Sequence, residues 1–224
     1  MNMIRKFVIS LGLVLLATPV ISGQDLSRYR RFALGSSLPA ISKQVGQGER
    51  QATLISESPA MIQEMTYWQI DASNSLGRTE PVSHISFNFY NGVLYRITVV
   101  YDQQETEGLT EEDMVKAISA RYGVGVRLYP EIDFPSHDVY SSPEKVIARW
   151  DDSENSVNFF HSTGPDSFGL VVFSKRLNAQ SEAAIVESAK LAKEQAPQKE
   201  IDRQKKQVDD LGVARQKNIK SFRP

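Results

Sequence analysis

The sequence predicts an α+β protein, built from two tandem α-β-β-β units that form an antiparallel sheet with the helices on one face, plus a polar C-terminal helix. Three observations lead to this class: a hairpin signal at residues 84–101, two helical patterns that share an Ala-Ile-Ser phrase and a glycine stop, and a polar composition from Ala179 onward. We place the two units at about 34–103 and 107–175.

The hairpin segment reads HISFNFYNGVLYRITVVY, in which Asn91-Gly92 joins two runs of β-branched and aromatic residues. Asn-Gly is the strongest short-range hairpin signal. A two-residue loop would set the apolar side of one strand beside the mixed side of the other. A three-residue loop, with Gly92 left-handed in a bulge, gathers the large apolar side chains on one face. We therefore predict the three-residue loop, with Phe87 opposite Tyr95.

Two helices are predicted from their caps. The segment GSSLPAISKQVG at 35–46 has serine N-caps, a proline in the first turn and Gly46 as the stop. In the second helix, Thr110 and Asp113 form a capping-box pattern, and Gly123 is the stop.

Short β-rich runs predict the remaining strands. They lie at 52–56, 62–70, 126–129, 145–150, 156–161 and 168–174. Residues 24–176 are predicted to form the tandem domain. A helical extension at 177–211, interrupted at Pro197 and ended by Gly212, precedes a basic tail at 212–224.

The N-terminus has the pattern of a secretory signal peptide. Arg5 and Lys6 precede a short apolar run at 7–17, and small residues lead to Gly23. The run is shorter than the roughly 20 apolar residues of a membrane span. We expect a cleaved signal peptide at 1–23, no membrane span afterwards, and a periplasmic or secreted protein; a retained anchor is the alternative.

Composition excludes several classes of function. The chain contains no cysteine, so disulfides, thiolate metal sites and a lipobox are excluded. The 26 basic and 27 acidic residues leave a formal net charge of -1, which provides no electrostatic basis for binding nucleic acid.

Signals for catalysis or metal binding are weak. The histidines, His84, His137 and His161, have no spacing that would let two of them ligate one metal. The acidic turn at 151–154 lacks the ligand pattern of a calcium loop. We therefore expect no enzyme, metal or cofactor; an envelope hydrolase using His161 and Asp151 is the alternative.

Candidate binding residues follow from the one-sided hairpin. Its polar face carries His84, Asn88 and Arg96, which we predict to contact a partner. Trp68 and Trp150 could line a groove. The C-terminal helix and tail form a second candidate surface, because so polar a helix bridges solvent or depends on a partner. Self-association through this helix is a further alternative, against which the absence of sustained heptads counts.

The order of a helix followed by strands ending in an Asn-Gly hairpin (GSSLPAISKQVG, then FNFYNGVLYRI) resembles the SmpA/OmlA family of small outer-membrane assembly proteins. Its doubling resembles the tandem fold of secreted β-lactamase-inhibitor proteins. The resemblance covers roughly Leu34 to Ser174, and the chain departs from both patterns in its missing cysteines and its long polar helix. It implies an exported, non-catalytic binding or assembly module with a protein partner in the cell envelope. No individual functional residue is transferred.

Overall fold

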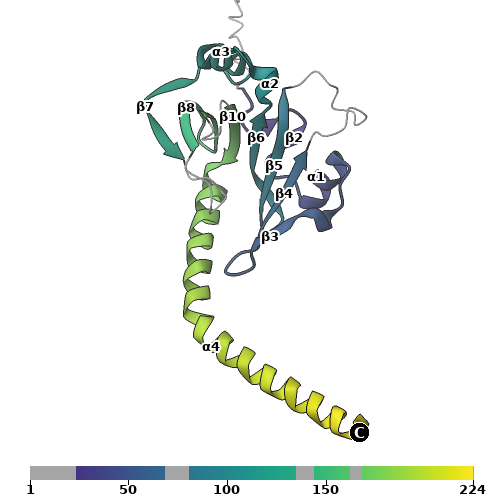
Figure 1. Ribbon diagram of the computed structural model, residues 1–224. Coiled ribbons are helices and arrows are strands. Elements are labelled where there is room, and N and C mark those ends of the chain that lie inside the picture. The colour runs from purple at the N-terminus through teal and green to yellow at the C-terminus, as the bar shows by residue number, and fades with distance from the viewer. Residues whose placement is uncertain (1–23, 69–80, 135–143, 162–167, 224) are drawn as a thin grey trace, which may run out of the picture.

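The computed structural model is α+β, as predicted, and combines an eight-stranded antiparallel sheet and a small two-stranded sheet with several helices (Figure 1). It describes residues 24–68, 81–134, 144–161 and 168–223. The predicted signal peptide at 1–23 and His137 lie outside the described residues.

Eight strands form the sheet in the order β3-β4-β5-β6-β10-β9-β8-β7. The first four are β3 (Thr53–Ser56), β4 (Ile62–Trp68), β5 (Val82–Tyr90) and β6 (Val93–Tyr101). The second four are β7 (Val126–Phe134), β8 (Glu144–Asp151), β9 (Asn155–His161) and β10 (Phe168–Ser174). Each half is a four-stranded meander. The eight strands lie at the predicted positions, although the formula α-β-β-β counts only three strands in each unit. The last strands of the two halves pair at the centre of the sheet.

The helices begin and end at the expected caps. Helix α1 (Leu38–Val45) ends at Gly46, whose φ of 70° is left-handed. Helix α3 (Glu111–Tyr122) begins with a capping box between Thr110 and Asp113 and ends at Gly123. The segment between β6 and α3 contains the short helix α2 (Gln103–Thr106). A 3-10 turn η1 (Glu49–Gln51) and a small hairpin of β1 (Arg28–Tyr29) and β2 (Phe32–Ala33) complete the first half.

One face of the sheet carries the main hydrophobic core. Both α1 and α3 contribute buried side chains to it, such as Ile41 and Ile118, which belong to one cluster with Phe87 on β5 and Leu170 on β10. Because this cluster crosses the β6–β10 junction, the two halves share a single core. The opposite face contains two smaller clusters, one of which includes residues of α4.

The predicted register of the hairpin is wrong. Asn91 and Gly92 form a two-residue turn in which both residues have positive φ, 50° and 78°, so Tyr90 pairs with Val93. A register shift then absorbs Tyr95 as an extra residue of β6. The bulge makes a two-residue turn compatible with a single apolar face, two features that appeared to exclude each other in the sequence. Beyond the bulge, Phe87 faces Ile97, and the apolar side chains of both strands share one face.

The predicted end of the C-terminal helix is also wrong. Helix α4 (Lys175–Ser221) runs through both Pro197 and Gly212 without interruption. A proline in a helix interior removes one hydrogen bond and disfavours the helix by about 3 kcal/mol, and glycine disfavours it by about 1 kcal/mol relative to alanine. Hydrogen bonding along the flanking turns carries the helix across both positions. In Figure 1, α4 leaves the sheet beyond β10 and extends alone to the C-terminus.

Candidate functional site

The first turns of α4 cover the hairpin face that the sequence presented as polar and open. Tyr95 in the bulge points to this face, and its hydroxyl lies 2.7 Å from that of Ser181 on α4. Ala184, one turn further, packs in a cluster with Ile62 of β4. The predicted recognition residues Asn88 and Arg96 are each only 1% exposed. They are therefore buried and do not form a free binding surface, which corrects the prediction.

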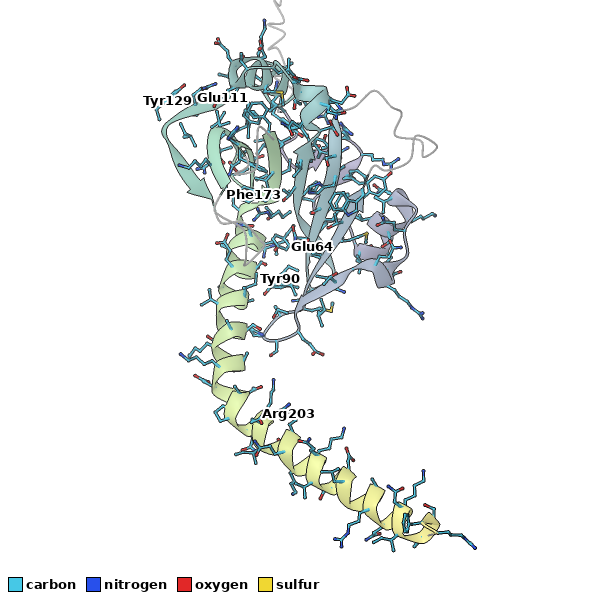
Figure 2. All side chains as sticks on the ribbon, in the orientation of Figure 1. Glu64, Tyr90, Glu111, Tyr129, Phe173 and Arg203 are labelled. Atoms are coloured by element: carbon cyan, nitrogen blue, oxygen red, sulfur yellow. The ribbon has the colours of Figure 1, made fainter. Side chains whose placement is uncertain are left out.

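Polar contacts satisfy much of this buried layer. The Asn88 amide donates to a carboxylate oxygen of Glu64 at 2.8 Å, and the Arg96 guanidinium donates to the Thr98 hydroxyl at 3.3 Å. Burial raises the pKa of Tyr95 to about 12, although the hydrogen bond with Ser181 opposes the shift. The phenol thus stays neutral near pH 7. Figure 2 shows Glu64, Tyr90 and Phe173 where α4 meets the sheet.

The structure brings together two pairs of predicted site residues, the buried Asn88 and Arg96 across β5 and β6, and Trp68 and His84 at the surface. Trp68 and His84 face each other across β4 and β5, with ring centroids 4.5 Å apart, and Trp68 is 53% exposed. Burial lowers the pKa of His84, while the nearby negative charge of Glu64 opposes this shift. This pair remains an accessible aromatic surface.

Trp150 belongs to the core. It is 2% exposed, and its indole N–H donates to the Gly123 carbonyl at 2.7 Å. A Cβ on Gly125 would overlap its ring, so the strand must approach the indole closely. Trp150 cannot line an open groove as the sequence suggested; it positions the end of α3 against β8 instead.

His161 and Asp151 lie at opposite ends of the β8–β9 pair. Asp151 pairs with Ser156, which is five residues before His161 on β9, a separation of about 17 Å along a strand. The Asp151 carboxylate instead contacts the Lys175 ammonium at 3.1 Å. The two residues therefore cannot act together as the acid and base of a hydrolase.

His161 does border a cavity of about 460 Å³, which lies between the α2–α3 segment, the end of β9 and the start of β10. Its described lining residues are mostly polar: Gln103, Gln104, Thr106, Glu107, Gly108, Leu109, His161 and Phe168. Within the described ranges, no group of three His, Cys, Asp or Glu side chains could hold a metal ion.

The far part of α4 projects away from the sheet (Figure 1). Every described residue from Ala192 onward is exposed, over a helix of about 45 Å at 1.5 Å per residue. Figure 2 shows Arg203 on this stretch, with no other element beside it. We call residues 192–221 the distal arm. Its exposed aliphatic side chains are Ile201, Val208, Leu211, Val213 and Ile219.

The sequence indicated only three of these aliphatic residues, Ile201, Val208 and Leu211, as sparse points in a polar segment. Four of the five, Ile201, Val208, Leu211 and Ile219, fall within about 80° of the helix surface at 100° per residue. The predicted stop at Gly212 concealed this alignment, because Ile219 then belonged to a separate tail. We call these four residues the apolar seam.

No protein-family model, curated protein or solved structure matches this chain. Among the described residues, no helix combines the length and apolar character needed to cross a membrane.

Proposed function

We propose that the protein is an exported, non-catalytic binding or assembly module of the cell envelope, and that the distal arm is its main contact element. The observation that carries this proposal is the complete exposure of the arm together with its aligned aliphatic residues. Export is supported by the basic and apolar N-terminal pattern that begins at Arg5 and Lys6.

The energetics of the arm favour a role in contact. Most helical stability in proteins comes from packing of one face against other elements. The base of α4 has such packing at Asn178, Ser181 and Ala184, whereas the arm has none within the described chain. Burying exposed apolar surface contributes about 25 cal/mol per Å². A bound protein would supply this contribution to the arm.

The separation of His161 from Asp151 favours binding over hydrolysis as the activity to test first. The accessible Trp68–His84 pair provides a second, smaller surface on the sheet domain. Both surfaces are compatible with a protein that recruits or links other proteins.

Truncation after Ala192 tests the proposal, because it removes the arm and keeps the buried base of α4. We expect the truncated mature protein to retain its thermal unfolding midpoint within a few degrees. Affinity purification from envelope extract would recover a specific protein with the full chain and lose it with the truncated chain. Recovery of the same proteins by both forms would contradict the role of the arm.

A further inference from the structure

The apolar seam belongs to a row of six residues along the distal arm. In order, Ile201, Gln204, Val208, Leu211, Arg215 and Ile219 all fall within the same arc of about 80°. Their spacings of three and four residues are those of a helix-pairing surface. The row spans about 27 Å of helix. So narrow an arc is suited to pairing with another helix and differs from the wide apolar face of a helix lying on a membrane.

The order of residue types in this row reads the same in both directions. From either end it is apolar, polar, apolar, apolar, polar, apolar. A two-fold axis near residue 210 would place Ile201 opposite Ile219 of a second copy, and Val208 opposite Leu211. A surface that complements itself under a two-fold rotation is the requirement for an isologous dimer.

The polar residues of the row select the antiparallel arrangement. Around the two-fold axis, Gln204 would face Arg215 of the other copy, where its amide oxygen can accept from the guanidinium. A parallel pair would instead bring the two Arg215 side chains together. The segment after Asp210 carries four basic residues and no acidic one, so parallel arms would repel each other along their ends.

A glycine flanks the row near the two-fold axis. Gly212 lies about 60° from the centre of the row, and the absence of a Cβ there allows the helices to approach closely.

We propose that the distal arms of two copies of this chain pair as an antiparallel helical dimer through the row Ile201 to Ile219. This inference rests on the proposed function, because both assign the arm to protein–protein contact, and it specifies a second copy as the occupant. The two Ala192 residues, where the arms begin, would stand about 54 Å apart, with the sheet domains at opposite ends.

Two matched valines provide the first test. Val208 and Val213 are 68% and 69% exposed, but only Val208 lies in the row, since Val213 is about 140° away. Sedimentation of the full mature chain, from about 10 µM to about 1 mM, should show a monomer–dimer equilibrium. Val208→Glu should weaken the dimer at least about tenfold, and Val213→Glu by less than about twofold. Equal effects of both substitutions would overturn the proposal.

The absence of native cysteine allows a second test that determines orientation. Chains with Ile201→Cys and with Ile219→Cys, mixed and oxidised, should form a disulfide between the two variants. Each variant alone should stay largely uncrosslinked, because identical positions lie about 27 Å apart in the antiparallel pair. Efficient crosslinking of Ile201→Cys with itself would overturn the antiparallel arrangement.

Other occupants give distinct results. A chain that remains monomeric at all concentrations and binds vesicles containing phosphatidylglycerol would replace the second copy with an anionic membrane. A monomer that still loses an envelope protein on truncation after Ala192 would overturn this inference and leave the proposed function intact. If the full chain forms the dimer but truncation after Ala192 loses no envelope protein, this inference stands and the proposed contact of the arm with an envelope protein is overturned.

Discussion

The hydroxyls of Tyr95 and Ser181, which are 86 residues apart in sequence, lie 2.7 Å from each other in the buried layer between β6 and α4. Tyr95 reaches this position because the bulge after the Asn91-Gly92 turn directs it away from the main core. The pair thus connects the hairpin geometry to the direction in which α4 leaves the sheet.

Tyr95→Phe should destabilise the protein by about 1–2 kcal/mol, because Ser181 is fully buried and would lose this hydroxyl partner. Urea unfolding of Tyr95→Phe, Ser181→Ala and the double variant would give the coupling energy between the two hydroxyls. Additive effects, with no coupling, would show that the hydrogen bond does not fix the base of α4.

The stability of the protein should fall at alkaline pH. The pKa of Tyr95 is about 12 in the folded chain against an ordinary value of 10.0, because burial disfavours the phenolate. Its contribution is therefore fully present below pH 10 and is lost as pH rises toward 12, by roughly 2–3 kcal/mol. Burial also raises the pKa of Tyr101, so the contribution of Tyr95 is isolated by comparison with Tyr95→Phe. Parallel curves for the two proteins would refute the assignment.

His84 should titrate below its ordinary pKa of 6.5, because burial disfavours the charged ring. Its contribution to stability is present above pH 6.5 and is lost as pH falls toward the lower pKa of the folded chain. Glu64→Gln removes the negative charge that opposes the shift, so it should lower the pKa of His84 further. Histidine proton NMR measures both midpoints, and a higher midpoint in Glu64→Gln would contradict this electrostatic account.

Gly169 on β10 lies directly opposite Phe160 on β9, and a Cβ at this glycine would overlap the phenyl ring. Gly169→Ala should therefore cost about 1–3 kcal/mol, since both residues are buried and the ring must move. Gly48→Ala is the matched control, because no atom lies near its Cβ position, and it should change stability by about 0.5 kcal/mol or less. Thermal unfolding of the two variants would show whether the ring can move freely; equal midpoints mean that it can.

Local sequence signals predicted the positions of the helix ends and strands. The helix caps at Thr110, Gly46 and Gly123 were predictable because capping depends on hydrogen bonds within a few residues. The turn at Asn91-Gly92 is equally local. Runs of β-branched and aromatic residues likewise predicted the positions of the eight strands of the sheet.

Features that depend on distant contacts could not be predicted in the same way. The bulge at Tyr95 lets the two-residue turn coexist with a one-sided apolar face. The buried tyrosine that it creates needs a hydrogen-bond partner, and this partner, Ser181, lies far along the chain. The burial of Asn88 and Arg96 likewise follows from α4, which the sequence gave no reason to place on that face. A glycine with positive φ ends many helices, but Gly212 does not have positive φ and α4 continues through it.

The central position of β6 has a consequence for how the chain reaches its native state. Its partners are β5, which precedes it directly, and β10, which follows only after the whole second meander. Until residues 168–174 are available, the β-branched strand Val93–Tyr101 is an open edge that can pair with another chain. Premature termination before β10 would therefore produce an aggregation-prone fragment, and the pairing of distant strands makes completion of the sheet a slow step.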